Sequence, residues 1–264
     1  MQATLQIEKR EGVAIVRLDR PDKRNALSFP MMRELVATAR ALGRDRGLRA
    51  VVLTGNGASF CAGLDVAELG NRGNRWFVFK ELLKPRQSLF QRMCTAWRAL
   101  PVPVVAAVHG HCLGGGLQLA LAADLRFACG DSQWSVMESR WGMVPDMGIT
   151  VTLRGLVRPD VAKELVWSAH VLDGAEAARL GLVTHLAEDP LDAALGWAGA
   201  LSACSPDAVL AGKRIVDAMH DASAWRTLWL EKWWQLKLLA GRNSAIARRR
   251  AKHPDTPWLP RRHR

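Results

Sequence analysis

The chain has 264 residues, of which 49% are hydrophobic and 23% are charged. This length and composition are typical of a globular protein with a sizeable core, and they exclude a disordered or fibrous chain. The formal net charge of +12 is unusual and predicts an anionic partner, such as a nucleic acid, an acidic membrane surface or a phosphorylated small molecule.

The first half of the sequence alternates predicted strands and helices. Residues 4–7 and 13–18 have strand patterns and are placed to pair across Glu11-Gly12. Ser28 is suited to cap a helix that runs to about Leu42. Further strands are predicted at 50–53, 104–108, 125–128 and 134–137, and a helix at 115–123.

After about Gly148 the pattern is mostly helical. Helices are predicted at 161–168, 175–180, 191–201, 206–219 and 222–240, with one strand at 182–186. Strand–helix alternation followed by a helical last third predicts an α/β fold with an appended helical layer.

Two short stretches carry the excess positive charge. Residues 70–101 hold seven basic residues against Glu81, a net of +6, and residues 241–264 hold eight against Asp255, a net of +7. The rest of the chain therefore sums to −1, so the basic character is local.

The cysteines and the N-terminus predict a cytoplasmic protein. The five cysteines are scattered, odd in number and form no CxxC pair, which favours reduced thiols over a disulfide framework or a zinc site. The N-terminus is too polar for a signal peptide, and no apolar run approaches the length of a membrane span.

Glycine-centred loops follow two of the predicted strands, where α/β proteins tend to place ligands. The loop at 55–60 has Phe60 where a dinucleotide fingerprint needs its last glycine, and the chain has neither a Walker A sequence nor a Gly-x-Ser-x-Gly elbow.

The loop at 109–118 places three consecutive glycines at the start of a helix, where exposed N–H groups suit an oxyanion. The glycines also suit close helix–strand packing, and both interpretations stay open. The cluster of His109, His111 and Cys112 is a weak metal motif, for which packing roles are favoured.

Several segments in a specific order resemble the crotonase superfamily, also called the enoyl-CoA hydratase/isomerase family. The resemblance covers nearly the whole chain. Its segments are Arg20-Pro21 with Arg24-Asn25-Ala26-Leu27, residues 59–65, residues 101–110 leading into Gly114-Gly115-Gly116, residues 122–126, Glu138 with Gly142-Met143-Val144-Pro145, and Ala177 with Leu180-Gly181-Leu182-Val183.

The resemblance implies a spiral of ββα repeats with a C-terminal helical trimerisation region. Residues 1–200 are expected to form the crotonase core for acyl-CoA binding and catalysis. Residues 201–264 are expected to form the helical region for oligomerisation and for covering the CoA moiety. The expected assembly is a homotrimer, or a hexamer made of two trimers.

The resemblance also implies an acyl-CoA thioester as substrate, with coenzyme A entering as part of it and no metal, flavin or nicotinamide cofactor. The thioester oxygen is expected to lie between the backbone N–H groups of Leu64 and Gly115, which stabilise an enolate. The residues expected to bind substrate and CoA are Arg24, Ala26, Ala62, Gly63, Asp65 and Gly114.

The acid–base residues depart from the hydratase pattern. Family hydratases have one glutamate three residues after the middle glycine and a second twenty residues later; here these positions are Gln118 and Glu138. A neutral amide at Gln118 can hold water by hydrogen bonds but cannot accept its proton. Asp146, eight residues after Glu138, replaces the glycine usual in hydratases and matches the Glu–Asp spacing of the family's dienoyl-CoA isomerases. A carboxylate there is also the nucleophile of the family's aryl-CoA dehalogenases.

The predicted catalytic residues are therefore Glu138, Asp146 and Gln118, with Glu138 as principal base and Asp146 as its partner. The alternatives are a surface glutamate at Glu138 and a turn residue or helix cap at Asp146.

The tryptophans predict packing surfaces. Trp225, Trp229, Trp233 and Trp234 share one helix face, which favours core or a subunit interface over base stacking. The aromatic residues proposed to line the acyl pocket are Trp141, Trp76, Phe77 and Phe79.

The leading hypothesis is an enzyme that shifts a double bond in an unsaturated acyl-CoA. The alternatives are an enoyl-CoA hydratase that uses Glu138, a nucleic-acid-binding protein that uses the basic tail, and a catalytically idle scaffold. Within the family framework the basic stretch at 70–101 is expected to border the acyl pocket. The last helix is expected near the CoA phosphates, often those of a neighbouring subunit, so the expected anionic partner is coenzyme A rather than nucleic acid. Residues 261–264 are expected to form a solvated tail.

Overall fold

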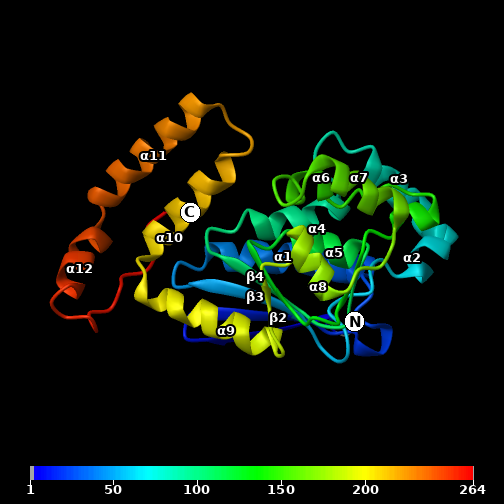
Figure 1. Cartoon of the computed structure of the whole chain (residues 1–264), viewed down its shortest axis with the longest axis horizontal. Helices are drawn as coiled ribbons and strands as arrows, with labels where there is room; N and C mark the ends of the chain where they lie inside the picture. Colours follow the sequence, from blue (N-terminus) through cyan, green and yellow to red (C-terminus); the bar gives the residue numbers. More distant parts are fainter. Residues whose placement is uncertain (1–2, 264) are drawn as a thin grey trace.

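Runs of Val, Ile, Leu and Ala form the sheet at the centre of the molecule (Figure 1). The computed structural model describes residues 3–263. Six strands lie in the order β1-β2-β3-β4-β6-β8, with β1 antiparallel to β2 and every other neighbouring pair parallel. The strands are β1 (Leu5–Arg10), β2 (Val13–Leu18), β3 (Ala50–Gly55), β4 (Val104–Val108), β6 (Leu125–Ala128) and β8 (His185–Leu186). The predicted α/β class is confirmed.

The first two strands form the hairpin that the sequence predicts. Glu11 and Gly12 both have positive φ, +47° and +82°, which is the backbone of a tight hairpin turn. The predicted strand at 182–186 is shorter than expected, because only His185–Leu186 pairs with β6.

Alternate residues of the parallel strands face two separate hydrophobic clusters. Val51 and Leu53 face the larger cluster, under helices α1 (Phe29–Arg44) and α4 (Leu89–Arg98). Ala50 and Val52 face a smaller cluster with α9 (Pro190–Ala200), which lies against the opposite face of the sheet in Figure 1. Burial on both faces explains why these strands have continuous apolar sequences.

A second, two-stranded sheet positions the glycine triplet. Strands β5 (His111–Leu113) and β7 (Gln133–Ser135) are parallel, and helix α5 (Gly115–Leu121) begins directly after β5. Gly114 is the N-cap of α5, with φ +51° and ψ −119°, a conformation that favours glycine.

The segment between β3 and β4 contains three helices that the sequence analysis did not predict: α2 (Val66–Gly70), α3 (Arg75–Leu82) and α4. In α3, Phe77 packs toward the core with its ring centroid 4.9 Å from that of Phe29, whereas Trp76 and Phe79 are exposed. Apolar side chains on both sides hide the helical period of α3, whereas α4 has one regular buried face.

The remaining helices of the core connect these layers. They are α6 (Ile149–Thr152), α7 (Pro159–Ser168), α8 (Gly174–Leu180) and the 3₁₀ helices η1 (Pro21–Lys23), η2 (Arg72–Asn74), η3 (Glu138–Trp141) and η4 (Leu201–Ala203). No helix within residues 3–263 has both the length and the apolar character needed to cross a membrane.

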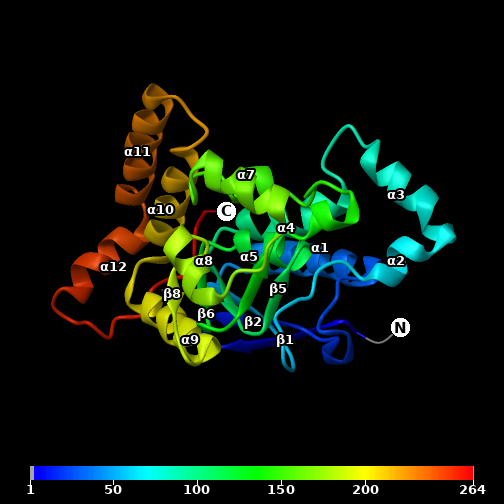
Figure 2. The same ribbon diagram turned by 45° about the vertical axis from the view of Figure 1, so that its right-hand side comes forward.

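Three C-terminal helices form an arm at the end of the molecule opposite α2 and α3 (Figure 2). They are α10 (Pro206–Ala218), α11 (Ala224–Leu239) and α12 (Arg242–Arg250). Helix α11 has no buried side chain, and Trp225, Trp229 and Trp233 are exposed on it. The tryptophan face is therefore not core within this chain.

The chain after α12 returns to the core, so the expectation of a solvated tail is wrong for Arg261. Its side chain is only 1% exposed and donates to the backbone oxygen of Asp45 at 2.8 Å. The backbone N–H of Arg261 donates to Arg46 O, and that of Arg262 donates to Asp207 Oδ1. Arg262 keeps an exposed side chain, and Arg264 lies outside the described residues.

Candidate active site

Two backbone N–H groups meet where the chain segment before α2 lies alongside β5. Cys61 N–H donates to His111 O at 2.8 Å, and Leu113 N–H donates to Cys61 O at 3.0 Å. Leu64 and Gly115 follow these paired residues in their two segments, and neither N–H donates to another protein group within residues 3–263. Gly115 is also the first residue of α5, whose N-terminal N–H groups have no intrahelical acceptor.

Glycine at position 63 permits the close approach of these two segments. Gly63 has φ +94°, and a Cβ built there lies 2.9 Å from Leu113 O and 3.7 Å from Gly115 N. A side chain would therefore collide with the β5 backbone beside the second N–H group. An oxyanion site needs two such N–H groups without protein acceptors, which is the role the sequence predicts for Leu64 and Gly115.

Glu138 lies against the N-cap of α5. A Cβ built on Gly114 lies 3.5 Å from Glu138 Oε1, and the glutamate side chain is only 8% exposed, which excludes a surface glutamate. Its Oε2 is buried and has no hydrogen-bond partner within residues 3–263. Burial raises the pKa of Glu138, and the nearby charge of Asp146 raises this pKa further.

Asp146 is partly buried in the loop between η3 and α6. Burial raises the pKa of this carboxyl group as well. Helix α6 has Gly148 as its N-cap, so Asp146 does not cap it. Two carboxyl groups with raised pKa values therefore lie in one part of the structure, a pattern found at acid–base sites.

Both carboxyl groups and both N–H donors border one cavity of about 170 Å³. Its wall is mostly apolar, which suits an acyl group close to a polar reacting centre. The lining residues are Ala62, Gly63, Leu64, Val66, Gly114, Gly115, Met137, Glu138, Trp141, Met143, Val144, Asp146 and Met147.

Gln118 lies behind Glu138 and does not line this cavity. It is fully buried, donates through Nε2 to Glu138 Oε1 at 2.7 Å, and accepts through Oε1 from the Met147 N–H at 2.9 Å. Both ends of the amide therefore contact protein groups.

Three of the six residues predicted to bind substrate and CoA line the cavity, and three do not. Ala62, Gly63 and Gly114 line the cavity, whereas Asp65 pairs with Arg20 at 2.8 Å and caps α2. Arg24 is exposed, and its backbone oxygen accepts from the Ala62 N–H at 2.9 Å. Ala26 is partly buried, and its backbone N–H donates to Lys23 O at 3.0 Å.

Among the aromatic residues proposed for the acyl pocket, Trp141 lines the cavity and Trp76, Phe77 and Phe79 do not. Sequence reasoning did not identify the methionines at 137, 143 and 147, because single methionines resemble ordinary core residues. The only signal for them was their position beside Glu138 and Asp146.

The His–Cys cluster shows no metal-binding geometry. His111 Nδ1 lies 2.9 Å from Ser59 Oγ, and His109 Nε2 lies 2.9 Å from Gly57 O. Across the part of the chain that the structure describes, no three His, Cys, Asp or Glu side chains form a group that could hold a metal ion.

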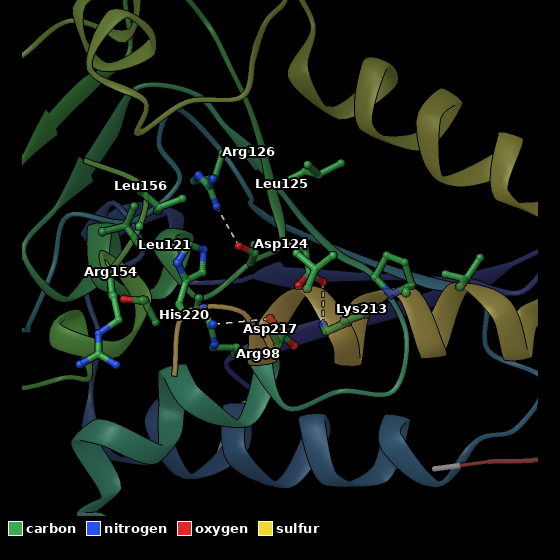
Figure 3. Close-up of a pocket in the computed structure, with 18 of the residues that line it drawn as sticks. Arg98, Leu121, Asp124, Leu125, Arg126, Arg154, Leu156, Lys213, Asp217 and His220 are labelled. Carbon is green, nitrogen blue, oxygen red and sulfur yellow. Dashed lines mark hydrogen bonds and ion pairs between the residues drawn. The ribbon is translucent and has the colours of Figure 1, made fainter. Parts of the chain in front are cut away.

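A larger cavity of about 530 Å³ lies between α10 and the core (Figure 3). Its charges are paired: Lys213 contacts Asp124 at 2.6 Å, and Arg98 contacts Asp217 at 3.5 Å. Burial lowers the pKa of Lys213. None of the predicted site residues lines this cavity, and its ion pairs connect α10 to the core. The smaller cavity is therefore the candidate active site.

Known proteins resemble the chain in sequence and in fold. The family model described as enoyl-CoA hydratase/isomerase matches residues 8–239. A Bacillus subtilis protein named as an enoyl-CoA hydratase/isomerase is 36% identical over 208 residues, 78% of each chain. The mouse mitochondrial Delta(3,5)-Delta(2,4)-dienoyl-CoA isomerase is 31% identical over 233 residues, which are 85% of this chain and 71% of that protein.

Solved structures show the same architecture. An enoyl-CoA hydratase from Mycobacterium tuberculosis H37Rv superposes with a TM-score of 0.84 at 30% identity, covering 98% of this chain and 99% of that chain. An enoyl-CoA hydratase from Bacillus anthracis gives a TM-score of 0.88 at 25% identity, with the same coverage of each chain.

Proposed function

The chain belongs to the enoyl-CoA hydratase/isomerase family, and from this membership we propose that it moves a double bond along the acyl chain of an unsaturated acyl-CoA. The observation that carries the proposal is the placement of Glu138 and Asp146 on one cavity, next to the N–H groups of Leu64 and Gly115.

The two N–H groups stabilise negative charge on the thioester oxygen. Removing a proton from the acyl chain of a thioester delocalises the electron pair onto that oxygen. Preorganised donors aimed at such a charge each lower the barrier by about 2.7–4 kcal/mol. Backbone donors at Leu64 and Gly115 also leave space for the thioester, because Gly115 has no side chain.

The two carboxyl groups divide the proton transfers. Glu138, as carboxylate, accepts a proton from one carbon of the acyl chain and forms the delocalised enolate. Asp146, as carboxylic acid, donates a proton to another carbon of the same conjugated system. One proton leaves and one arrives, so the product is an isomer of the substrate. A proton then passes from Glu138 through solvent to Asp146 before the next turnover. Burial raises the pKa of both carboxyl groups, which brings each closer to the range in which it can exchange protons near neutral pH.

The mouse relative named as a dienoyl-CoA isomerase supports this reaction over simple hydration. Hydration by Glu138 is the second candidate, supported by the solved hydratase structures. Gln118 argues against hydration with two carboxylates, because an amide cannot accept a proton from water, and this one lies behind Glu138 rather than on the cavity.

The CoA moiety is proposed to bind along the exposed side of the site, at Arg24, Ala26 and the backbone around Ala62. The proposed assembly is a trimer or a pair of trimers, in which the exposed tryptophan face of α11 packs against a second copy of the chain. An amphipathic face without any buried side chain favours a protein partner.

A panel of acyl-CoA thioesters tests the proposed reaction. Purified protein is incubated with 2-enoyl-, 3-enoyl- and 3,5-dienoyl-CoA, and the products are followed by absorbance and mass. The proposal predicts altered absorbance without a change of mass. A gain of about 18 mass units, the mass of one water molecule added by a general base, supports hydration instead. Inactivity on the whole panel contradicts both reactions.

A further inference from the structure

Gln118 forms a buried bridge between the two parts of the site that carry the carboxyl groups. Its Nε2 holds Glu138 Oε1, and its Oε1 holds the backbone N–H of Met147, the residue after Asp146. Both partners lie later in the sequence, Glu138 twenty residues and Met147 29 residues after Gln118. It therefore connects η3 and the loop before α6 to helix α5.

The hydrogen-bond chemistry allows only one orientation of this amide. A backbone N–H can only donate, so the Gln118 carbonyl oxygen must face Met147. The NH₂ group then faces Glu138, and Glu138 Oε1 must accept. A proton on the Glu138 carboxyl group is thereby directed to Oε2, which is buried and has no partner within residues 3–263.

We propose that Gln118 is a positioning residue that makes Oε2 of Glu138 the oxygen that accepts the substrate proton, and that holds the Asp146 loop beside it. The inference rests on the proposed acid–base role of Glu138. It replaces the expectation that Gln118 holds water, because both ends of its amide are occupied by protein groups.

An amide performs this task where a carboxylate cannot. A glutamate at position 118 keeps the acceptor for Met147 but places a second carboxylate 2.7 Å from Glu138 Oε1. Two carboxylates at that distance share a proton, so their titrations become coupled. The hydrogen bond donated by Gln118 favours the charged form of Glu138 and opposes the effect of burial on its pKa.

The test measures the pKa of Glu138 directly and in parallel with catalysis. Full-length protein labelled with ¹³C at the glutamate carboxyl carbon is titrated by NMR, and the Glu138 resonance is assigned by its loss in Glu138→Gln. The variants are Gln118→Leu, which removes both hydrogen bonds, and Gln118→Glu, which keeps the shape and, when protonated, both bonds.

The proposal predicts that Gln118→Leu raises the pKa of Glu138 by about one unit or more, since loss of a hydrogen bond to the charged form disfavours it. In Gln118→Glu the two carboxyl groups titrate as a coupled pair, and the pair loses its last proton at a higher pH than Glu138 does in the wild type. The acidic limb of the kcat profile moves up by the same amount. At neutral pH, kcat falls at least about tenfold while KM changes much less, because the substrate does not touch Gln118.

Asn243→Leu is the matched control. Asn243 is a buried amide in the arm with the same pair of contacts, donating to Asp207 Oδ2 at 2.8 Å and accepting from the Leu259 N–H at 3.1 Å. This control is expected to lower the melting temperature and leave the pKa of Glu138 unchanged.

An unchanged Glu138 pKa in both Gln118 variants overturns the proposal. If Gln118→Leu does not fold, the isosteric Gln118→Glu decides the question alone. The NMR titration does not depend on which reaction the enzyme catalyses. A wild-type protein inactive on the acyl-CoA panel therefore overturns the proposed function, while the titration still decides the role of Gln118.

Discussion

Two buried amides, Gln118 in the core and Asn243 in the arm, each donate to a carboxylate and accept from a backbone N–H. The two carboxylates differ in whether their second oxygen has a hydrogen-bond partner. Asn243 holds Asp207, whose other oxygen accepts from the Arg262 N–H at 2.8 Å. Gln118 holds Glu138, whose other oxygen has no partner in the described chain. The arm carboxylate is fully used to fix the C-terminal chain. The core carboxylate keeps one buried oxygen available for chemistry.

The same contrast extends to the two regions as wholes. The core buries its side chains between two hydrophobic clusters and contains all residues of the candidate active site. The arm contains α11, which buries no side chain and exposes Trp225, Trp229 and Trp233. The core therefore contains the whole candidate active site, whereas the arm exposes a large apolar surface.

The largest expected effect comes from substituting Glu138, the carboxylate whose Oε2 has no partner within residues 3–263. Glu138→Gln should lower kcat by about 10³-fold, because it removes a general base while keeping the shape of the side chain. CoA-thioester binding, measured by calorimetry, should remain. The arm counterpart, Asp207→Asn, should lower the melting temperature and leave most of kcat. Unchanged turnover in Glu138→Gln would show that Glu138 is not the general base.

The backbone donor at Gly115 gives the next largest effect. Gly115→Pro removes the N–H at the first position of α5, where proline is compatible with a helix, and should lower kcat by about 10²–10³-fold. Its matched control is Gly115→Ala, because a Cβ there meets Met147 Sδ at 2.7 Å in both variants but alanine keeps the N–H. Equal losses of kcat in both variants would assign the effect to crowding.

The exposed face of the arm should control assembly rather than chemistry. Trp229 and Trp233 stack with ring centroids 5.5 Å apart and are both exposed. Replacing both with serine should shift the assembly toward monomer in sedimentation experiments, because large apolar surfaces drive association. The core fold, followed by circular dichroism, should remain. An unchanged oligomeric state would remove α11 from the interface.

The pH dependence of stability should distinguish the buried carboxylate from an ordinary one. Because burial raises the folded-state pKa of Glu138 above its unfolded value, the group contributes stability at low pH and loses it as pH rises through the folded pKa. Glu138→Gln should therefore melt at the same or a higher temperature than the wild type at pH 8, and this difference should shrink as the pH falls toward 4. A lower melting temperature at pH 8 would mean that the charged form is stabilised by the fold.

The smallest effect is expected from the basic end of α12. Substituting Arg248, Arg249 and Arg250 with glutamine should weaken CoA-ester affinity by less than about tenfold, because exposed ionic contacts are individually weak. The salt dependence of binding should decrease at the same time. Unchanged affinity would show that these three arginines do not contribute to CoA binding.

The sequence predicted those parts of the fold that local patterns determine. Strands β4 and β6 have the predicted bounds, because apolar runs bounded by turn residues are typical of buried strands. Helix α3 was not predicted, since its apolar and charged residues form no clear helical face. Helix α4 was missed although Leu89, Phe90, Met93, Cys94 and Trp97 recur at helical spacing and form its buried face. The burial of Arg261 was not predictable either, because it depends on contacts with Asp45 and Arg46, far away in the sequence.

For the candidate site, the residues could be predicted from the sequence but their contacts could not. The resemblance to the family implied roles for Leu64, Gly115, Glu138 and Asp146, and the structure places all four residues on one cavity. Spacing also singled out Gln118 but not its contacts, because hydrogen bonds to Glu138 and to the Met147 backbone depend on how three elements pack.

The most direct test of the account is the turnover of 3,5-dienoyl-CoA by wild-type protein, Glu138→Gln and Asp146→Asn, followed in parallel by absorbance and mass. The account predicts that the wild type forms an isomer of unchanged mass, and that both variants bind the thioester but leave it unconverted. A wild-type product that has gained the mass of water, or full turnover by Asp146→Asn, would contradict the claim that the two carboxyl groups together move a double bond.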